Sequence, residues 1–491
     1  MLETVPSRRR LGVAGALVAG ALTACQTPAQ VPNPSQPTAQ RQSDKTQRRS
    51  VAVTVYNQNF GLVRDTRRLQ LARGKVELAF KDVSAHIQPE TVRLHASTPG
   101  ANLSVLEQDY RYDLLTPSKL LEKHVGRSVI LYRYDPKTGA ETKKTAEVLS
   151  VEGGVTLRID GEVTSDVRGR FAFSEVPRDL LEKPTLVWLL ESDRAEQDVE
   201  VTYLTQNLNW RADYVLQLDE TDSRASLTGW VTLDNRSGVS YENAALRLVA
   251  GDVNRTTPSA EAATDALSDR EEDAPADQAG GFSEQGLFEY HLYTLQRPTS
   301  LLDKETKQVA LLAAENVAVT KQLVLDGEGR YYRARYGQLE TNQKVGVFVE
   351  LMNSEQNRLG LPLPKGTVRL YKADRDGALQ FLGEDAIDHT PRDERLRLKV
   401  GEAFDVVADR VQKEFNQLGR CVAESSYQVE LRNHKSSDVR VLVNEPISGD
   451  WEVLQHDQPF VKVDASTLRF DVNVPARSSS KLSYRVRLRY C

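Results

Sequence analysis

The sequence contains none of the short signatures that identify the common enzyme classes. It has no Walker loop, dinucleotide-binding glycine fingerprint, Gly-x-Ser-x-Gly elbow, His-Glu-x-x-His pair or Cys-x-x-Cys pair. Matches to penicillin-binding signatures occur at 137–139, 241–243 and 478–481, but in reversed order, and the serine stretch leads into a strand pattern instead of a helix. We attribute these matches to chance, so the sequence offers no catalytic residue and implies no cofactor.

An excess of basic residues is also missing. The 491 residues include 64 Lys and Arg against 69 Asp and Glu, a formal net charge of −5. Binding to nucleic acid depends on clustered positive charge, so we expect no nucleic-acid partner. The chain is 27% charged and 40% hydrophobic, which is typical of a globular protein, and it is long enough for two to four domains.

Long hydrophobic runs are represented by a single stretch, Leu11–Ala24, which follows Arg8, Arg9 and Arg10. As a helix it would measure about 21 Å, shorter than a bilayer's hydrocarbon core. A basic start followed by a short apolar run is typical of a signal peptide, so we assign residues 1–24 to one and expect the protein to be exported.

The residues that end this run, Leu22 to Cys25, resemble the lipobox of bacterial lipoproteins. The resemblance implies that Cys25 is lipidated and becomes the mature N-terminus, which makes membrane lipid a partner; the alternative is an ordinary signal peptide followed by a chance cysteine. Gln26, in place of Asp, implies sorting to the periplasmic side of the outer membrane, as in enterobacteria. Ser7–Leu11 also resembles a twin-arginine motif, which leaves the export route open.

Cysteine is scarce: apart from Cys25, the sequence has only Cys421 and Cys491. In an oxidising compartment these two could form a disulfide, and the alternative is two free thiols.

Alternating apolar and polar residues dominate from Val51 onwards, so we predict a mainly β fold. A small N-terminal β domain with one short helix, which begins at Thr116-Pro117, should be followed by β-sandwich-type domains, of which the last resembles an immunoglobulin-like unit. The predicted organisation is a signal peptide (1–24), a lipidated Cys and flexible linker (25–50), an N-terminal β domain (51–183), a central β-sandwich domain (184–418) and a C-terminal β-sandwich unit (419–491).

Two segments interrupt this pattern. Residues 255–286 are rich in Asp and Glu, and we expect a disordered acidic loop; calcium capture is the alternative, although no calcium-loop spacing occurs. In 402–419, apolar residues fit both helical and strand spacing.

Two clusters are candidate sites. Carboxylates and an imidazole concentrate at 384–394 and could hold a divalent metal, although a solvated surface loop fits equally; the candidate ligands are Asp385, Asp388, His389, Asp393 and Glu394. Tyrosines interleaved with arginines could stack on sugars or anchor a protein, although half-packed strand tyrosines give the same pattern; the strongest such run is Tyr331, Tyr332, Arg333, Arg335 and Tyr336.

Four segments together resemble the bacterial domain-of-unknown-function family 4139, which is shared with the C-terminal half of mucoidy-inhibitor-like proteins. They are Val55–Asn59, Leu208–Tyr214, the stretch from Gly229 to Asp252, and Leu361–Gly366. Ala212-Asp213-Tyr214 and Leu-Pro-Leu-Pro-x-Gly are the most specific. The resemblance implies an exported, mostly β protein with 402–419 partly extended, which favours a strand there, and it implies no established activity.

Taken together, these features favour a membrane-anchored envelope lipoprotein that acts as a non-catalytic scaffold or interaction protein. Envelope proteins or peptidoglycan are the expected partners. Two alternatives stay open: a metal-assisted envelope hydrolase that uses the 384–394 cluster, and a glycan-binding or peptidoglycan-binding protein.

Overall fold

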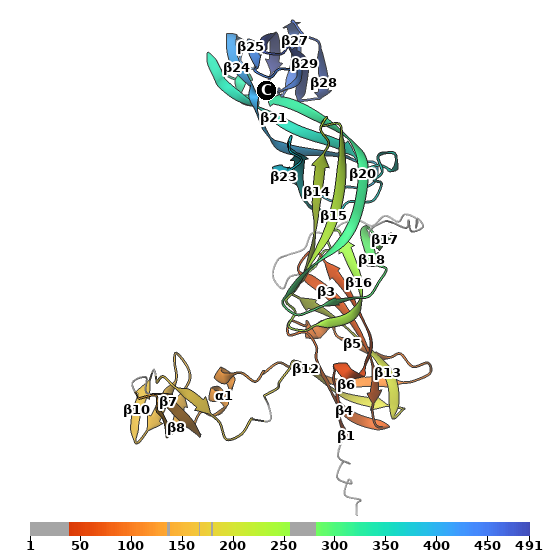
Figure 1. Ribbon diagram of the computed structural model, residues 1–491, viewed down its shortest axis with the longest axis vertical. Helices are drawn as coiled ribbons and strands as arrows, with labels where there is room; N and C mark the ends of the chain where they lie inside the picture. The colour runs from red at the N-terminus through yellow and green to blue at the C-terminus, as the bar shows by residue number, and fades with distance from the viewer. Residues whose placement is uncertain (1–38, 135–137, 166, 178–179, 256–280) are drawn as a thin grey trace, which may run out of the picture. The chain divides into compact units, whose positions relative to one another are not determined.

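The computed structural model describes residues 39–134, 138–165, 167–177, 180–255 and 281–491, and most of them lie in β-strands (Figure 1). The predicted mainly β fold is therefore confirmed. Cys25 and the predicted signal peptide lie outside the described residues. The helical elements of the described part are α1 (Pro117–Lys123) and the short 3-10 helices η1 (Lys45–Gln47), η2 (Pro89–Thr91), η3 (Gly329–Tyr332) and η4 (Glu355–Asn357).

Two sheets combine segments from both sides of residue 183. The four-stranded sheet has the order β1 (Ala39–Ser43), β4 (Gly74–Lys81), β12 (Thr185–Ser192) and β6 (Leu103–Arg111). The eight-stranded sheet has the order β17 (Phe282–Leu287), β18 (Tyr290–Leu295), β16 (Tyr241–Ala250), β2 (Arg48–Tyr56), β3 (Phe60–Gln70), β13 (Glu196–Gln206) and β5 (Arg93–Ala96), with β19 (Thr299–Leu301) beside β16. Strands distant in sequence therefore pair within single sheets.

Alternation along the strands produces the core of these sheets. In β13, Val199, Val201 and Tyr203 are buried, as the sequence pattern predicts, while the intervening side chains are more exposed. The same hydrophobic cluster includes Trp188 of β12, Val53 of β2 and Leu248 of β16, so it joins both sheets.

A separate five-stranded sheet lies in the chain between the paired strands β6 and β12. Its order is β10 (Glu162–Ser165), β9 (Thr156–Ile159), β8 (Glu141–Ser150), β7 (Ser128–Tyr134) and β11 (Arg170–Ala172). Helix α1 contributes Leu121 to the small core of this unit. The predicted start of α1 is confirmed, because the Thr116 hydroxyl accepts a hydrogen bond from the Lys119 N–H at 3.2 Å and Pro117 occupies the first turn.

The largest sheet has 13 strands and includes two unusually long ones, β20 and β24. Its main order is β23 (Leu379–Ile387), β22 (Gly366–Ala373), β14 (Leu208–Leu218), β15 (Arg224–Asn235), β20 (Glu305–Asp326), β21 (Gln338–Met352), β24 (Arg395–Gly419), β25 (Val422–Asn433), β30 (Ser478–Arg489) and β27 (Asp450–His456). Strands β26 (Val439–Pro446), β29 (Thr467–Val474) and β28 (Phe460–Asp464) branch from β20 through β26. Figure 1 shows β14, β15 and β20 side by side.

A second core lies within the C-terminal part of this sheet. Side chains of β26 and β29, such as Val443 and Phe470, share one hydrophobic cluster with side chains of β25 and β30, such as Val429 and Val486. Strands β20 and β24 contribute residues to this cluster and also to the first one. The two cores are therefore connected by continuous hydrogen-bonded strands.

The predicted domain boundaries differ from this arrangement. The boundary at 183 separates β2 and β3 from their partners β16 and β13. The boundary at 418 falls at the end of β24, whose residues 406–419 pair with β25. The first difference arises because β2 and β3 pair with strands far away in sequence, which leaves no local signal. At the second boundary, Gly419 is followed by the short turn of a hairpin, which keeps β24 and β25 in one sheet.

Two predicted irregular segments are shorter than expected. Residues 39–43, within the predicted linker 25–50, form β1, which pairs in parallel with β4. An edge strand is held by main-chain hydrogen bonds, so a polar composition does not exclude it. Residues 282–287, within the predicted loop 255–286, form β17, where Glu284 faces His291 at 2.8 Å. The loop residues 256–280 lie outside the described part of the chain.

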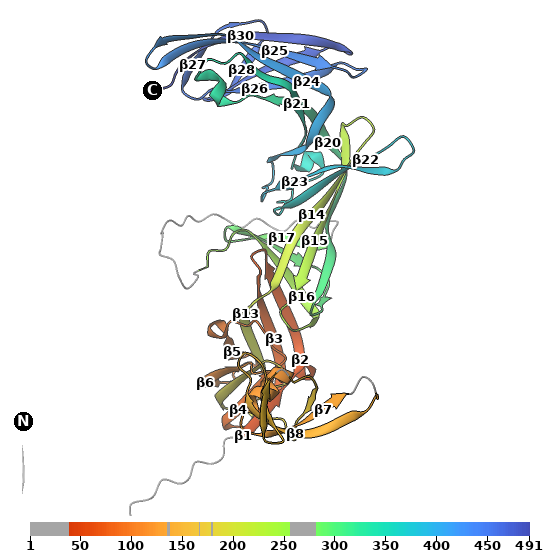
Figure 2. The same ribbon diagram turned by 90° about the vertical axis from the view of Figure 1, so that its left-hand side faces the viewer.

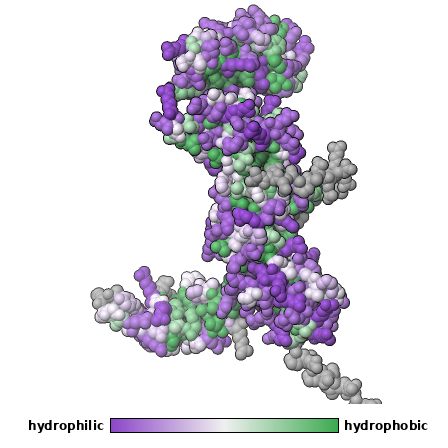
Figure 3. Space-filling model, turned by 45° about the vertical axis from the view of Figure 1, so that its right-hand side comes forward, coloured by the Kyte–Doolittle hydropathy of each residue, from purple (hydrophilic) through white to green (hydrophobic). Residues whose placement is uncertain are grey.

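Hydrophilic residues cover most of the face drawn in Figure 3, with smaller hydrophobic areas between them. Among the described residues, no helix is both apolar enough and long enough to cross a bilayer.

Cys421 and Cys491 form a disulfide with their Cα atoms 5.5 Å apart. It closes a span of 70 residues that includes β25 to β30. We expect the double variant Cys421→Ala/Cys491→Ala to lose roughly 4 kcal/mol of unfolding free energy, because the unfolded chain regains the entropy of an open loop. Urea unfolding in the absence of reductant measures this loss. An unchanged midpoint would contradict the prediction, and wild-type protein under reductant should match the variant.

Candidate functional site

The five predicted metal ligands are not brought together. The carboxylate of Asp385 in β23 accepts hydrogen bonds from the backbone N–H groups of Ala386 at 2.9 Å and Lys399 at 2.7 Å. Asp388, Asp393 and Glu394 are exposed. Within the described residues, no group of three or more His, Cys, Asp or Glu side chains is placed to hold a metal ion.

The metal site predicted at 384–394 is therefore not formed. Asp385 lies in β23, whereas the other four residues lie in the irregular segment between β23 and β24. Asp388, Asp393 and Glu394 extend into solvent, so closeness in sequence does not become closeness in space.

His389 also has defined polar partners. Its Nδ1 accepts a hydrogen bond from the backbone N–H of Lys365 at 3.2 Å, and its Nε2 lies 3.3 Å from Nδ2 of Asn57. Burial lowers the pKa of His389, and Lys365 and His291 act in the same direction, while Asp252 and Asp388 oppose them. The ring is therefore neutral at pH 7, with its proton on Nε2, and the Asn57 amide satisfies it when its oxygen faces the ring.

This contact lies where the segments that carry the family resemblance meet. Asn57 is in the turn between β2 and β3, and Lys365 belongs to the Leu-Pro-Leu-Pro-x-Gly segment. Two buried tyrosines hold that segment: Tyr214 donates to the Pro364 carbonyl at 2.8 Å, and Tyr293 donates to the Pro362 carbonyl at 2.8 Å. We call the contact among Asn57, Lys365 and His389 the Asn57–His389 junction.

The two most specific sequence signatures lie directly against each other. Strands β14 and β22 pair in parallel, with Ala212 opposite Gly366, and a Cβ at Gly366 would overlap the Ala212 carbonyl. Asp213 accepts from Thr232 at 2.7 Å and pairs with Arg369 at 3.0 Å. Burial opposes the charge of Asp213, but these partners outweigh it and lower its pKa. The signatures therefore encode strand packing and an ion pair at the sheet surface.

We expect acid to weaken the Asn57–His389 junction. Because the folded state lowers the pKa of His389, its contribution to stability is fully present above the ordinary histidine pKa of about 6.5 and is lost as pH falls from there toward the folded value. Thermal melts of wild type and His389→Asn between pH 7.5 and 5 measure this: the difference between them should shrink with acid. The control is His95→Asn, whose imidazole is 58% exposed. A constant difference for His389→Asn across the range would contradict the prediction.

The predicted tyrosine-arginine binding surface is wrong for its first two residues. Tyr331 and Tyr332 are 1% and 0% exposed and belong to the C-terminal core. The Tyr332 hydroxyl donates to Glu445 at 2.7 Å. Arg333 and Arg335 remain exposed. The tyrosines are core residues because helix η3 turns them into the sandwich, a direction that sequence spacing alone does not give.

Glu445 also pairs with Arg410, and both side chains are fully buried. Nε and Nη2 of Arg410 have no hydrogen-bond partner among the described residues. Burial opposes the charge of Arg410, but the Glu445 carboxylate with Tyr484 and Tyr332 outweighs burial and raises its pKa. Sequence analysis missed this pair, because the two residues are 35 positions apart and each follows an ordinary strand pattern.

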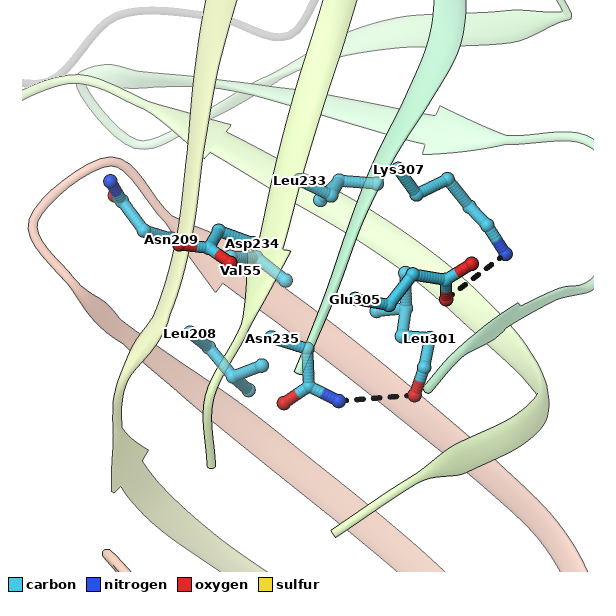
Figure 4. A pocket seen from close by; sticks show the side chains of 9 residues that line it. All are labelled: Val55, Leu208, Asn209, Leu233, Asp234, Asn235, Leu301, Glu305 and Lys307. Carbon is cyan, nitrogen blue, oxygen red and sulfur yellow. Dashed lines mark hydrogen bonds and ion pairs between the residues drawn. The ribbon is translucent and has the colours of Figure 1, made fainter. Parts of the chain in front are cut away.

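A narrow recess lies between the turn after β15 and the start of β20 (Figure 4). It is too narrow to admit a water molecule. Its polar side chains serve the fold: Asn235 donates to the Leu301 carbonyl at 3.0 Å, and Lys307 pairs with Glu305 at 3.5 Å. The recess is therefore a packing feature of the turn, and the Asn57–His389 junction is the better candidate site.

Comparison with known families places Lys365 and His389 of the junction within one matched segment, while Asn57 lies outside it. Residues 199–491, more than half of the chain, match the family described as domain of unknown function (DUF4139). The chain belongs to the DUF4139 family. The match covers β14 and β22 of this DUF4139 protein, and it also covers His389 and the C-terminal sandwich. A search of curated proteins found no match.

Proposed function

We propose that this DUF4139 protein is an exported lipoprotein, anchored through Cys25 to the periplasmic side of the outer membrane, and that it acts there as a non-catalytic scaffold or interaction protein. The short apolar run and the lipobox-like residues support the anchor. Several acyl chains on one cysteine hold firmly, because each buried methylene contributes about 0.8 kcal/mol.

The main support for the scaffold role is that the two hydrophobic cores share strands β20 and β24. Residues of β20 and β24 enter both hydrophobic clusters, so one cannot separate from the other without breaking continuous sheet. The His389 imidazole and the Asp385 carboxylate, which are the polar groups best suited to chemistry, are engaged in contacts that hold segments of this sheet together. Such an arrangement is suited to hold bound partners at fixed positions and to carry mechanical load, and it is less suited to open around a substrate.

Sheet edges are the expected contact surfaces for envelope partners. Strands β6, β23 and β28 end their sheets among the described residues, and each carries an exposed apolar side chain. Leu106 is 44% exposed, Phe381 is 55% exposed and Val461 is 64% exposed. Unpaired backbone groups beside apolar side chains are suited to strand addition by another protein.

Site-specific photocrosslinking in cells tests this proposal. A photoreactive residue is placed at Leu106, Phe381 or Val461, with Arg211 on the interior strand β14 as the matched exposed control. We expect a discrete crosslinked envelope protein from at least one edge position, absent from the Arg211 position and lost in the Cys25→Ser background. Identical crosslinked products from all four positions, or no crosslinked product from any of them, would refute the interaction role.

A further inference from the structure

The outer face of the C-terminal sandwich contains a polar hollow of about 190 Å³. It lies over β24, β25, β30 and β27, which Figure 2 shows beside the C-terminus. Its lining residues are Lys413, Ser426, Tyr427, Gln428, Gln455, His456, Asp457, Ser483, Tyr484 and Arg485. Tyr427 and Tyr484 are buried in the core, so their strand neighbours Ser426, Gln428, Ser483 and Arg485 point to the opposite, outer face. We call this feature the β25–β30 hollow.

Two features of the strands create the hollow. Ser426 and Ser483 are small, so the middle of this face lacks the long side chains that cover neighbouring positions. The flanking strands also bulge: pairing shifts between Gln412 and Glu414 in β24 and between Val453 and Gln455 in β27. A bulge places an extra residue in a strand and bends it. The bulged strands β24 and β27 therefore border the hollow, and β25 and β30 form its floor.

The side chains around the hollow divide into satisfied and free groups. Both oxygens of Asp457 accept from the Ser483 N–H at 2.9 and 2.8 Å, and Arg485 pairs with Glu414. In the part of the chain that the structure describes, four lining side chains make no hydrogen bond or ion pair with protein: Lys413, Ser426, Gln428 and Gln455. The lining acid is therefore satisfied, while one cation, two amides and a hydroxyl remain available to a ligand.

We propose that the β25–β30 hollow binds a carboxylate-bearing ligand the size of a single sugar or amino-acid residue. The hollow has room for several water molecules, which suits one such residue. The Lys413 ammonium would supply a charge-assisted hydrogen bond to the carboxylate, which is stronger than a neutral one. The amides of Gln428 and Gln455 would bind hydroxyl or amide groups of the remainder.

Matched probes test the role of the carboxylate. N-acetylmuramic acid and N-acetylglucosamine share a ring and an acetamide, and only the former carries a carboxylate. We expect the purified full chain to bind N-acetylmuramic acid at least tenfold more tightly than N-acetylglucosamine in calorimetric titrations at 50 mM salt. D-alanyl-D-alanine, a peptide carboxylate, distinguishes an amino-acid source of the same chemistry from a sugar source. Binding of neither acid at 20 mM, or equal binding of both sugars, would overturn the proposal.

Variants locate the binding. Lys413→Gln should weaken the tighter acidic probe at least tenfold and leave N-acetylglucosamine unchanged, and Ser426→Phe should remove binding by filling the hollow. Lys481→Gln is the matched control, because Lys481 is an exposed lysine of β30 that does not line the hollow. Equal affinities for wild type and Lys413→Gln would assign binding elsewhere and refute the proposal. The choice of probes rests on the proposed envelope location, but binding in solution needs no anchor, so its failure would leave the scaffold proposal standing.

Discussion

Replacement of Glu445 by alanine is expected to lower the unfolding free energy of the C-terminal sandwich by about 3–5 kcal/mol. Among the described residues, Glu445 provides the one carboxylate that pairs with the buried guanidinium of Arg410, and the change removes it. Two nitrogen atoms of that guanidinium already lack a hydrogen-bond partner there. It also takes away the acceptor of the Tyr332 hydroxyl. An uncompensated buried charge is one of the few single changes that produces so large a loss.

Hydrogen exchange followed by mass spectrometry measures this effect locally. Peptides from β25 and β30 should exchange faster in Glu445→Ala, whereas peptides from the five-stranded sheet, which has a separate core, should not change. Glu452→Ala is the matched control: Glu452 pairs with Arg487 at 3.7 Å but is 67% exposed. The Glu452→Ala variant should lose less than about 1 kcal/mol of unfolding free energy. Wild-type exchange rates in Glu445→Ala would contradict the burial of the pair.

A double substitution separates the pair's own contribution from the penalty of breaking it. Arg410→Met/Glu445→Leu should be more stable than either single variant, because it leaves no charge in the core. If instead the double variant loses the sum of both single losses, the two residues do not interact in the way that the structure indicates.

Replacement of Cys25 by serine is expected to move nearly all of the protein from the membrane fraction to the soluble fraction. Serine has no thiol to acylate, so the variant lacks every methylene that the proposed anchor buries. Metabolic labelling with a fatty acid and the intact mass of the mature chain test this directly: wild type should carry the label and the added mass, and the variant should carry neither.

Gln26→Asp is the control for that experiment. By the sorting rule that the resemblance to lipoproteins implies, this change should alter the membrane in which the protein resides and leave acylation intact. If Cys25→Ser fractionates like wild type, the lipobox-like residues do not direct lipidation. That result would also refute the proposed location.

Local patterns recovered much of the secondary structure. The capped start of α1 and the buried face of β13 follow from residue type and spacing within a few positions. The segment 402–419 shows where such patterns fail. Phe404, at helical spacing, is 88% exposed, whereas the buried alternating face of β24 includes the polar residues Arg410 and Gln412. Only the family resemblance favoured a strand there, and the strand is confirmed.

By itself, the sequence determined the β character of this protein, the lipoprotein-like signals at its start and the cysteines that could pair, because each depends on residue type or on short-range spacing. The tertiary structure decided which strands share a sheet, which tyrosines are buried and which polar groups meet. The Asn57–His389 junction joins residues 332 positions apart. The Arg410–Glu445 pair lies in the C-terminal core, to which β24, β25, β26, β29 and β30 all contribute. Pairing across long loops is set by the mutual burial of whole strand faces, and no short window of sequence contains both partners.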